Sequence, residues 1–193
     1  MNRTEILSVL EERGAVMRGH FRLSSGRHSD LFAQKFRVLE HPGLAQSFGQ
    51  HLAEMFDEPY DSVASPAIGA LVLGFCTALA AHKRFVFAER VDDQMVFRRG
   101  FSFEPKERVL VVEDVVTTGG SAREVVDLIR SQGAEAIGVG VLIDRKDAAR
   151  ADIGVPLKAL VSLPSESWES DECPLCQRGE PLTDPGSRRA AAG

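Results

Sequence analysis

The feature that most constrains the fold is the alternation of short apolar runs with helical segments. The runs RVLVVEDV at 108–115 and AEAIGVGVLID at 134–144 have the length and apolar content of buried strands, and the segment 121–133 between them has helical periodicity. Strands that are apolar on both faces occur in parallel sheets, and each parallel connection requires a crossover. The alternation therefore predicts an α/β fold in which helices flank a central parallel sheet.

The remaining segments fit the same plan. Thr4 is expected to cap a short helix that stops near Gly14, and the run that begins at Pro42 places its apolar side chains on one helical face. The other expected elements are a strand–turn–strand unit at 19–42 that turns at 24–26, a strand–loop–helix–strand unit at 60–90, a hairpin or mobile arm at 92–100, and a strand at 155–163. A chain of 193 residues is long enough to build one domain with a sizeable core.

The composition is that of an ordinary globular protein and argues against several functions. Apolar residues make up 44% of the chain, charged residues make up 26%, and the net charge is −5, which predicts no general attraction to nucleic acid or to an anionic membrane. No apolar run approaches the length of a membrane span, and the N-terminal residues do not have the pattern of a signal peptide. Three cysteines are too few for a disulfide framework, so the expected location is the cytoplasm.

Two acids followed by a glycine turn form the most informative local motif, VLVVEDVVTTGGSARE at 109–124. Glu113 and Asp114 stand at the carboxyl end of a predicted strand, where open parallel sheets bind their ligands. Ser121 and Glu124 match a capping box, so a helix is expected to begin at Ser121, and the backbone N–H groups of such a helix start favour phosphate. The acids need a neutral or cationic partner instead, such as ribose hydroxyls or hydrated Mg²⁺. The motif therefore suits a phosphorylated sugar, and the alternative is a capped helix with incidental acids.

The ordered string of strand, two acids, two apolar residues and glycine loop resembles the phosphoribosyl diphosphate (PRPP) motif of type I phosphoribosyltransferases. The resemblance implies that Glu113 and Asp114 hold the ribose hydroxyls, that the loop 117–121 wraps the 5′-phosphate, and that Arg90 reaches the pyrophosphate. The implied PRPP-binding set is Arg90, Glu113, Asp114, Val115, Val116, Thr117, Thr118, Gly119, Gly120 and Ser121. Asp114 is also expected to act in catalysis. The cofactor Mg²⁺ is expected to bind mainly through the PRPP pyrophosphate and water, with no metal ligand from the protein.

Three further segments are similar to orotate phosphoribosyltransferases in particular. GHFRLSSGRHSDLF at 19–32 resembles the N-terminal signature of that group, SPAIGALVLG at 65–74 resembles its pyrophosphate loop, and LIDRKDAAR at 142–150 resembles the strand end that carries an arginine against the orotate carboxylate. That arginine would be Arg145, whose guanidinium can bind a carboxylate bidentately. Thr117 is expected to share in orotate binding, and Phe32 is a candidate for stacking on the base.

The resemblance also implies an architecture and partners. It predicts a type I phosphoribosyltransferase fold in a single domain, 1–193, with a small hood formed by N- and C-terminal segments. The N-terminal hood segment spans 1–40, the core spans 41–163, and the C-terminal extension spans 164–193, with a tail that is flexible from about 183. Orotate and PRPP are the expected partners, with no nucleic acid and no membrane. A homodimer is expected, with a mobile loop that acts on the neighbouring site.

The basic residues depart from the better-known members, which carry lysines in the SG turn, the pyrophosphate loop and the mobile loop. The corresponding places here hold Ser24, Gly69, and Val91 with Gln94. Arg98 and Arg99 are hypothesised to supply the missing charge and to act in catalysis, and the alternative is a basic hairpin on the surface. A surface ion pair is likewise the alternative role for Arg145.

The cysteines and His28 carry weaker signals. Cys173 and Cys176 form one C-x-x-C pair, whereas a structural zinc site needs four ligands, and the third cysteine, Cys76, lies in an apolar helical segment. Reduced, structural cysteines are therefore expected, with a zinc ion shared across a dimer or a redox pair as alternatives. His28 is expected to be a surface group that forms hydrogen bonds.

Three other functions remain open at this point. A phosphoribosyltransferase for a purine base would keep the PRPP loop but would need a different base pocket, and the signature at 19–32 argues against it. A non-catalytic PRPP- or nucleotide-sensing regulator is conceivable because lysines are missing, although it would be expected to present a basic face to nucleic acid. A plain scaffold leaves the acid and glycine loop unexplained.

Overall fold

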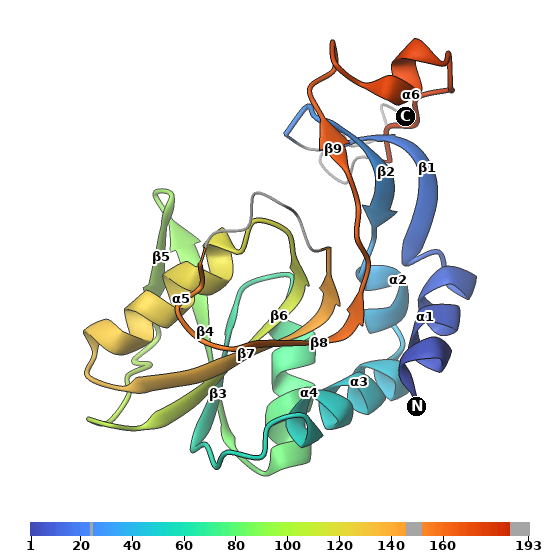
Figure 1. The fold of residues 1–193 in the computed structure, drawn as a ribbon. Helices are drawn as coiled ribbons and strands as arrows, with labels where there is room; N and C mark the ends of the chain where they lie inside the picture. The colour runs from blue at the N-terminus through green and yellow to red at the C-terminus, as the bar shows by residue number, and fades with distance from the viewer. Residues whose placement is uncertain (24, 146–151, 186–193) are drawn as a thin grey trace.

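The computed structural model describes residues 1–23, 25–145 and 152–185, and its centre is a six-stranded sheet (Figure 1). The strands are β3 (Ser62–Pro66), β4 (Arg84–Val91), β5 (Gln94–Phe97), β6 (Arg108–Val116), β7 (Glu135–Asp144) and β8 (Leu157–Ser162). Their order in the sheet is β5–β4–β3–β6–β7–β8, and every neighbouring pair is parallel except β4 and β5. The predicted α/β fold with a central, mostly parallel sheet is confirmed.

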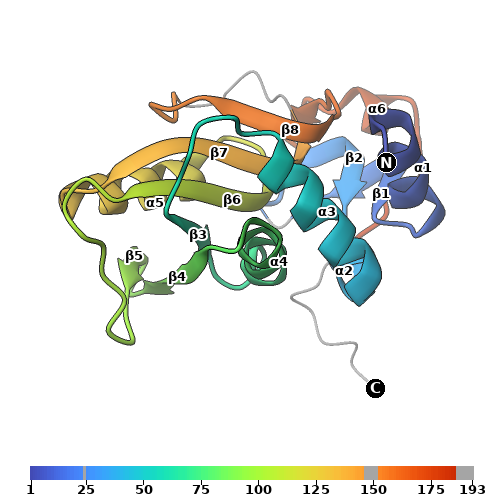
Figure 2. The same ribbon diagram turned by 90° about the horizontal axis from the view of Figure 1, so that it is seen from below.

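Helices cover both faces of this sheet. The helices α3 (Pro42–Glu54) and α4 (Leu71–Ala81) pack on one face, and α5 (Gly120–Ser131) packs on the other (Figures 1 and 2). Along β6, Leu110 and Val112 join the buried cluster on the α3–α4 side, while Val109 and Val111 join the cluster under α5. Burial on both faces explains why the four residues Val109–Val112 of this strand are all apolar.

The contact between α3 and α4 depends on a glycine. A Cβ added at Gly49 would lie 2.6 Å from the backbone carbonyl carbon of Cys76, so only glycine allows the two helices this close approach. Phe48 and Leu52 are fully buried on the same face of α3, as the apolar spacing predicted.

The first helix, α1 (Arg3–Glu12), begins earlier than predicted. The side chain of Asn2, rather than that of Thr4, caps it: Asn2 Oδ1 accepts a hydrogen bond from Glu5 N, and the Glu5 carboxylate accepts one from Asn2 N. This reciprocal capping box satisfies two backbone donors at once, which a cap at Thr4 would not do. The helix supplies Ile6 and Leu10 to the core cluster, so part of the segment 1–40 packs directly on the core.

A second, smaller sheet forms the hood at one end of the molecule, at the upper right of Figure 1. It contains β1 (Val16–Arg22), β2 (His28–Ala33) and β9 (Ser167–Trp168), so N- and C-terminal segments form the hood as predicted, and the pairing of β2 with β9 joins them. Two single-turn helices accompany it, α2 (Phe36–Leu39) and α6 (Pro174–Gln177). Thr183, where the flexible tail was expected to begin, exchanges backbone hydrogen bonds with β1, and residues 186–193 lie outside the described range.

The described residues contain no helix that is both long and apolar enough to cross a membrane.

Candidate active site

A cavity of about 400 Å³ lies at the carboxyl end of the central sheet, where parallel strands present their ligand-binding edge. Its walls come from the loop after β3, the ends of β4 and β6, and the start of α5. The structure brings the whole predicted PRPP-binding set to this cavity, from Arg90 through Glu113 to Ser121. Six of its lining residues come from outside the predicted set: Lys35, Pro66, Ala67, Gly69, Met95 and Ala122.

The two acids at the end of β6 are nearly buried yet face the cavity. Glu113 is 7% exposed and Asp114 is 4% exposed, and both line the cavity wall. Backbone amides orient them, because Asp114 N donates to Glu113 Oε1 at 3.1 Å and Val115 N donates to Asp114 Oδ1 at 2.5 Å. Burial, followed by the neighbouring charge of Asp114, raises the pKa of Glu113 well above its usual range. A carboxyl that keeps its proton can donate a hydrogen bond to a hydroxyl as well as accept one.

Lys35 supplies a positive charge that the sequence patterns did not indicate. Its Nζ lies 3.1 Å from Asp114 Oδ2, and it reaches the cavity from the segment just after β2. A Cβ added at Gly69 would overlap Asp114 Oδ2 and lie 3.1 Å from Lys35 Nζ. Gly69 therefore leaves room for the ion pair, and Lys35 brings an ammonium to the place where the resemblance expects a lysine of the pyrophosphate loop. The feature of the sequence that could have indicated Lys35 is its position directly after the signature at 19–32.

The loop between β6 and α5 has the geometry of an anion site. Gly119 adopts a left-handed conformation, with φ of 82°, and is the N-cap of α5, which begins at Gly120. This conformation favours glycine, and the exposed N–H groups at the helix start favour a bound phosphate.

The predicted capping box at Ser121 and Glu124 is wrong. Ser121 lies inside the first turn of α5, and no side chain caps the helix. Glu124 instead accepts hydrogen bonds from Arg90 Nη2 at 2.8 and 3.0 Å, because the end of β4 lies next to the first turn of α5. Arg90 also donates to the backbone oxygen of Asp93 at 2.5 Å, so its guanidinium is oriented at the mouth of the cavity.

The predicted base-binding residues do not all line the cavity. Thr117 lines it, whereas Arg145 and Phe32 are not among the described residues of its wall. Arg145 follows β7 directly, and its guanidinium donates to Ser29 Oγ at 2.8 Å and to Ser165 Oγ at 2.9 Å. It is 7% exposed, so the alternative of a solvated surface arginine is wrong.

Phe32 packs against another aromatic ring of the hood hairpin. Phe32 stacks in a tilted arrangement on Phe21, with ring centroids 5.7 Å apart, inside the hood hairpin. The rest of the segment expected to carry the base-binding strand end, residues 146–150, lies outside the described range, as does Ser24.

Arg98 and Arg99 lie beyond β5 rather than at the cavity wall. The segment 92–100 forms a hairpin with β4, one of the two predicted forms. Arg99 makes a two-point ion pair with Glu89, at 2.9 and 3.1 Å, and lies over the ring of Phe87. The arrangement matches the surface-hairpin alternative in this state, and the catalytic role of the two arginines stays a prediction.

Comparison with known proteins agrees with this geometry. A family model described as the phosphoribosyl transferase domain matches residues 79–170. The orotate phosphoribosyltransferase of Caldanaerobacter subterraneus subsp. tengcongensis is 46% identical over 190 residues, which cover 98% of this chain and 100% of the relative. The orotate phosphoribosyltransferase of Desulforamulus reducens is 44% identical, with coverage of 98% and 99%. A crystal structure of the orotate phosphoribosyltransferase from Aeropyrum pernix is 31% identical, has a TM-score of 0.65, and covers 82% of this chain and 93% of that one.

The parallel sheet and the cavity that joins two acids to a glycine loop are features of the type I phosphoribosyltransferases. Within that class, the chain belongs to the orotate phosphoribosyltransferase family, because relatives with more than 40% identity match nearly its whole length.

Proposed function

We propose that the protein transfers the phosphoribosyl group of PRPP to orotate, giving orotidine 5′-monophosphate and pyrophosphate. In this reaction a bond forms between the ribose C1 and a ring nitrogen of orotate, and the bond from C1 to the pyrophosphate oxygen breaks. The observation that carries the proposal is one cavity that combines two buried acids, a glycine loop at a helix start, and the cations Lys35 and Arg90. The identity of the full-length relatives supports orotate as the acceptor.

The cavity accounts for how the sugar phosphate would be held. The N–H groups of the loop 117–121 suit the 5′-phosphate, since anions bind where a helix leaves its first amides unpaired. Glu113 and Asp114 suit the ribose hydroxyls, and the negative charge of Asp114 beside the ribose would also stabilise the cationic character that develops at C1. The protein then acts by positioning and electrostatics, without a covalent intermediate.

The leaving group and its cation fit the other wall of the cavity. Lys35 and Arg90 are the cations available there, and each is paired with an acid that a pyrophosphate could replace. Because Lys35 already neutralises Asp114, the acids do not form an all-protein magnesium cage, and Mg²⁺ is proposed to bind through the pyrophosphate and water. When bound, Mg²⁺ would neutralise charge on the leaving pyrophosphate.

Arg145 is proposed to read the orotate carboxylate. Serine hydroxyls from the hood and from the C-terminal segment orient its buried guanidinium, whose planar fork has the geometry for a bidentate contact with a carboxylate. Thr117 would contact the same substrate from the loop side, and Phe32 remains the proposed stacking candidate.

The proposed assembly is a homodimer in the cytoplasm. Four apolar side chains, spaced to share one face of α4 and the turn before it, stay exposed: Ile68, Val72, Phe75 and Leu79. An exposed apolar stripe of this kind marks a protein interface, here between two copies of the chain. The cytoplasm would also keep the three free cysteines reduced.

A base-panel assay tests the proposal. Purified protein is incubated with PRPP and Mg²⁺ together with orotate, adenine or hypoxanthine, and loss of each base is followed with pyrophosphate release. Orotate alone should be consumed, in equal amounts with pyrophosphate released. Consumption of a purine in place of orotate would contradict the base assignment, and PRPP binding without turnover of any base would favour a regulator.

A further inference from the structure

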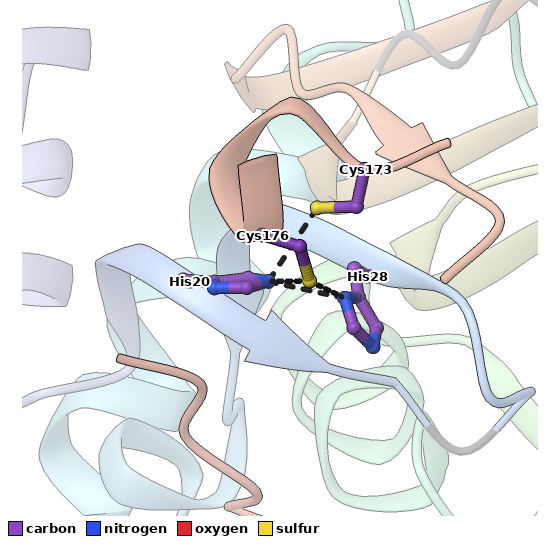
Figure 3. A group of neighbouring side chains, drawn as sticks. All are labelled: His20, His28, Cys173 and Cys176. Carbon is purple, nitrogen blue, oxygen red and sulfur yellow. Dashed lines mark hydrogen bonds between the residues drawn. The ribbon is translucent and has the colours of Figure 1, made fainter. Parts of the chain in front are cut away.

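Two histidines and two cysteines from opposite ends of the chain meet in the hood. His20 and His28 lie on β1 and β2, while Cys173 is the N-cap of α6 and Cys176 lies within α6, in the C-terminal extension (Figure 3). One ligand atom from each residue lies within 4.8 Å of all the others. This cluster is separate from the cavity described above and takes no part in the proposed reaction.

We propose that His20, His28, Cys173 and Cys176 bind one zinc ion, which fastens the C-terminal extension to the hood hairpin. The C-x-x-C pair offers two ligands by itself, and the hairpin brings two histidines of the same chain to it. The expectation that His28 lies at the surface is also wrong, since this side chain is only 3% exposed. Four protein ligands leave no open position, so the site is structural rather than catalytic.

Four of the six distances between the ligand atoms lie close to the edges of a tetrahedron around one ion, and all six are within 4.8 Å. With Zn–N of about 2.0–2.1 Å and Zn–S of about 2.3 Å, neighbouring ligand atoms should stand roughly 3.3–3.8 Å apart. His20 Nε2 lies 3.1 Å from His28 Nδ1, 3.5 Å from Cys173 Sγ and 3.7 Å from Cys176 Sγ. His28 Nδ1 lies 3.3 Å from Cys176 Sγ. An iron–sulfur cluster with two histidines would hold the nitrogens and the sulfurs on different irons, whereas here both kinds of ligand face a single point.

A further hydrogen bond of His20 determines which of its ring nitrogens can bind a metal. Its Nδ1 lies 2.9 Å from the backbone oxygen of Glu180, and because a carbonyl only accepts, Nδ1 must carry the proton. In a neutral ring Nε2 then has a free lone pair, directed at the other three ligand atoms. Metal-binding histidines in proteins commonly donate their other N–H to a carbonyl or carboxylate in this way.

The charge and the burial of the four side chains also fit Zn²⁺, which binds both nitrogen and sulfur ligands. His20, His28 and Cys173 are at most 4% exposed, and only Cys176 opens toward solvent. On binding, the two thiols each lose a proton to solvent, and two thiolates with two neutral imidazoles then balance a charge of +2. A tetrahedral set of two sulfurs and two nitrogens is typical of zinc.

The position of the cluster explains what such an ion would do. Ser29, which holds the Arg145 guanidinium, directly follows His28 on β2 and also donates to the backbone oxygen of Glu166 in the C-terminal segment. The extension also meets the hairpin through the short β2–β9 pairing, the bridge at Thr183, and the contacts of Arg27 with Ser167 and Glu169. A metal at this point would fix the hairpin and the extension together next to the proposed orotate site.

Metal analysis of the full-length protein tests the proposal directly. Protein purified without chelator from zinc-containing medium should carry about one zinc ion per chain. Chelator-stripped protein should take up added Zn²⁺, and Co²⁺ should give the visible absorption of a tetrahedral thiolate site. The thermal midpoint should fall by at least about 5 °C when zinc is removed.

Variants assign the metal to these residues. H20Q and C176S should each lose zinc, and C176S changes an exposed residue, so it should fold. C76S is the matched control, because Cys76 lies in α4 away from the cluster, and it should keep its zinc. The proposal would be overturned by wild-type protein that neither contains zinc nor binds added Zn²⁺, by full zinc content in H20Q and C176S, or by a Cys173–Cys176 disulfide in protein from a reducing cytoplasm.

Discussion

At the scale of single residues, the charges of the cavity are arranged in opposed pairs. Lys35 faces Asp114, and Arg90 faces Glu124, so each cation is held by an acid that lies beside the proposed substrate path. Such pairs orient the side chains before PRPP arrives. The cations can then transfer their hydrogen bonds to phosphate oxygens at little cost in side-chain order.

Lys35 provides the first test at this scale. Lys35→Met keeps most of the apolar stem but removes the ammonium, and the kcat/KM for PRPP should fall about 10- to 100-fold, because a hydrogen bond to a charged group contributes about 1.5–3 kcal/mol. Lys83→Met is the control, since Lys83 is exposed at the start of β4. Steady-state kinetics that differ less than about twofold from wild type would remove Lys35 from the pyrophosphate site.

The raised pKa of Glu113 predicts that the folded protein becomes less stable as the pH rises. Burial and the charge of Asp114 raise its folded-state pKa well above the usual 4.5, so above pH 4.5 the folded protein keeps a proton that the unfolded chain has lost. The free energy of unfolding should therefore fall as pH rises from 4.5 through the raised pKa. Glu113→Gln has no such proton and should lose less stability over the same range in urea titrations. Parallel curves for the two proteins would contradict this.

At the scale of elements, the longer strands and helices could be predicted from periodicity, because each buries a continuous apolar face. The short elements α2, β9 and α6 could not, since they are held by tertiary contacts such as the pairing of β9 with β2. The capping box at Ser121 was predicted wrongly because local spacing does not show that Arg90, 34 positions away in sequence, pairs with Glu124.

The proposed metal site shows the same limit of local patterns. His20 and Cys173 are 153 residues apart, and only the antiparallel hairpin and the returning C-terminal segment bring them together. By contrast, the PRPP-binding residues were predicted because nearly all of them stand in one continuous stretch, from the end of β6 to the start of α5.

The β4–β5 hairpin leads into Arg98 and Arg99, whose catalytic role is a hypothesis. If Arg98 and Arg99 supply charge to the pyrophosphate, the double variant R98A/R99A should lose about 100-fold or more in kcat. Glu89→Gln breaks the ion pair of Arg99 but keeps both arginines, so it should retain turnover. Equal losses in the two variants would show that the hairpin needs its ion pair, and near-normal kinetics of R98A/R99A would remove both arginines from catalysis.

At the scale of the whole molecule, a hood built from both ends of the chain stands beside a core whose helix α4 exposes an apolar stripe (Figure 1). Leu79 is 54% exposed, so Leu79→Glu should leave the monomer folded but place two charges in the proposed dimer interface. Light scattering after size exclusion should report a dimer for wild type and a monomer for the variant. Leu182→Glu, on the distant extension, should remain dimeric, and a monomeric wild type would contradict the assembly.

Phosphoribosyl transfer to orotate is proposed to take place in the cavity that Glu113 and Asp114 line at the end of β6. The most direct measurement is the rate of orotate consumption with PRPP and Mg²⁺ by wild-type protein and by D114N, with circular dichroism to verify the fold of both. Wild type should turn over orotate, and folded D114N should lose about 100-fold in kcat, because the variant removes negative charge beside the ribose. Undiminished turnover in D114N would place the chemistry elsewhere.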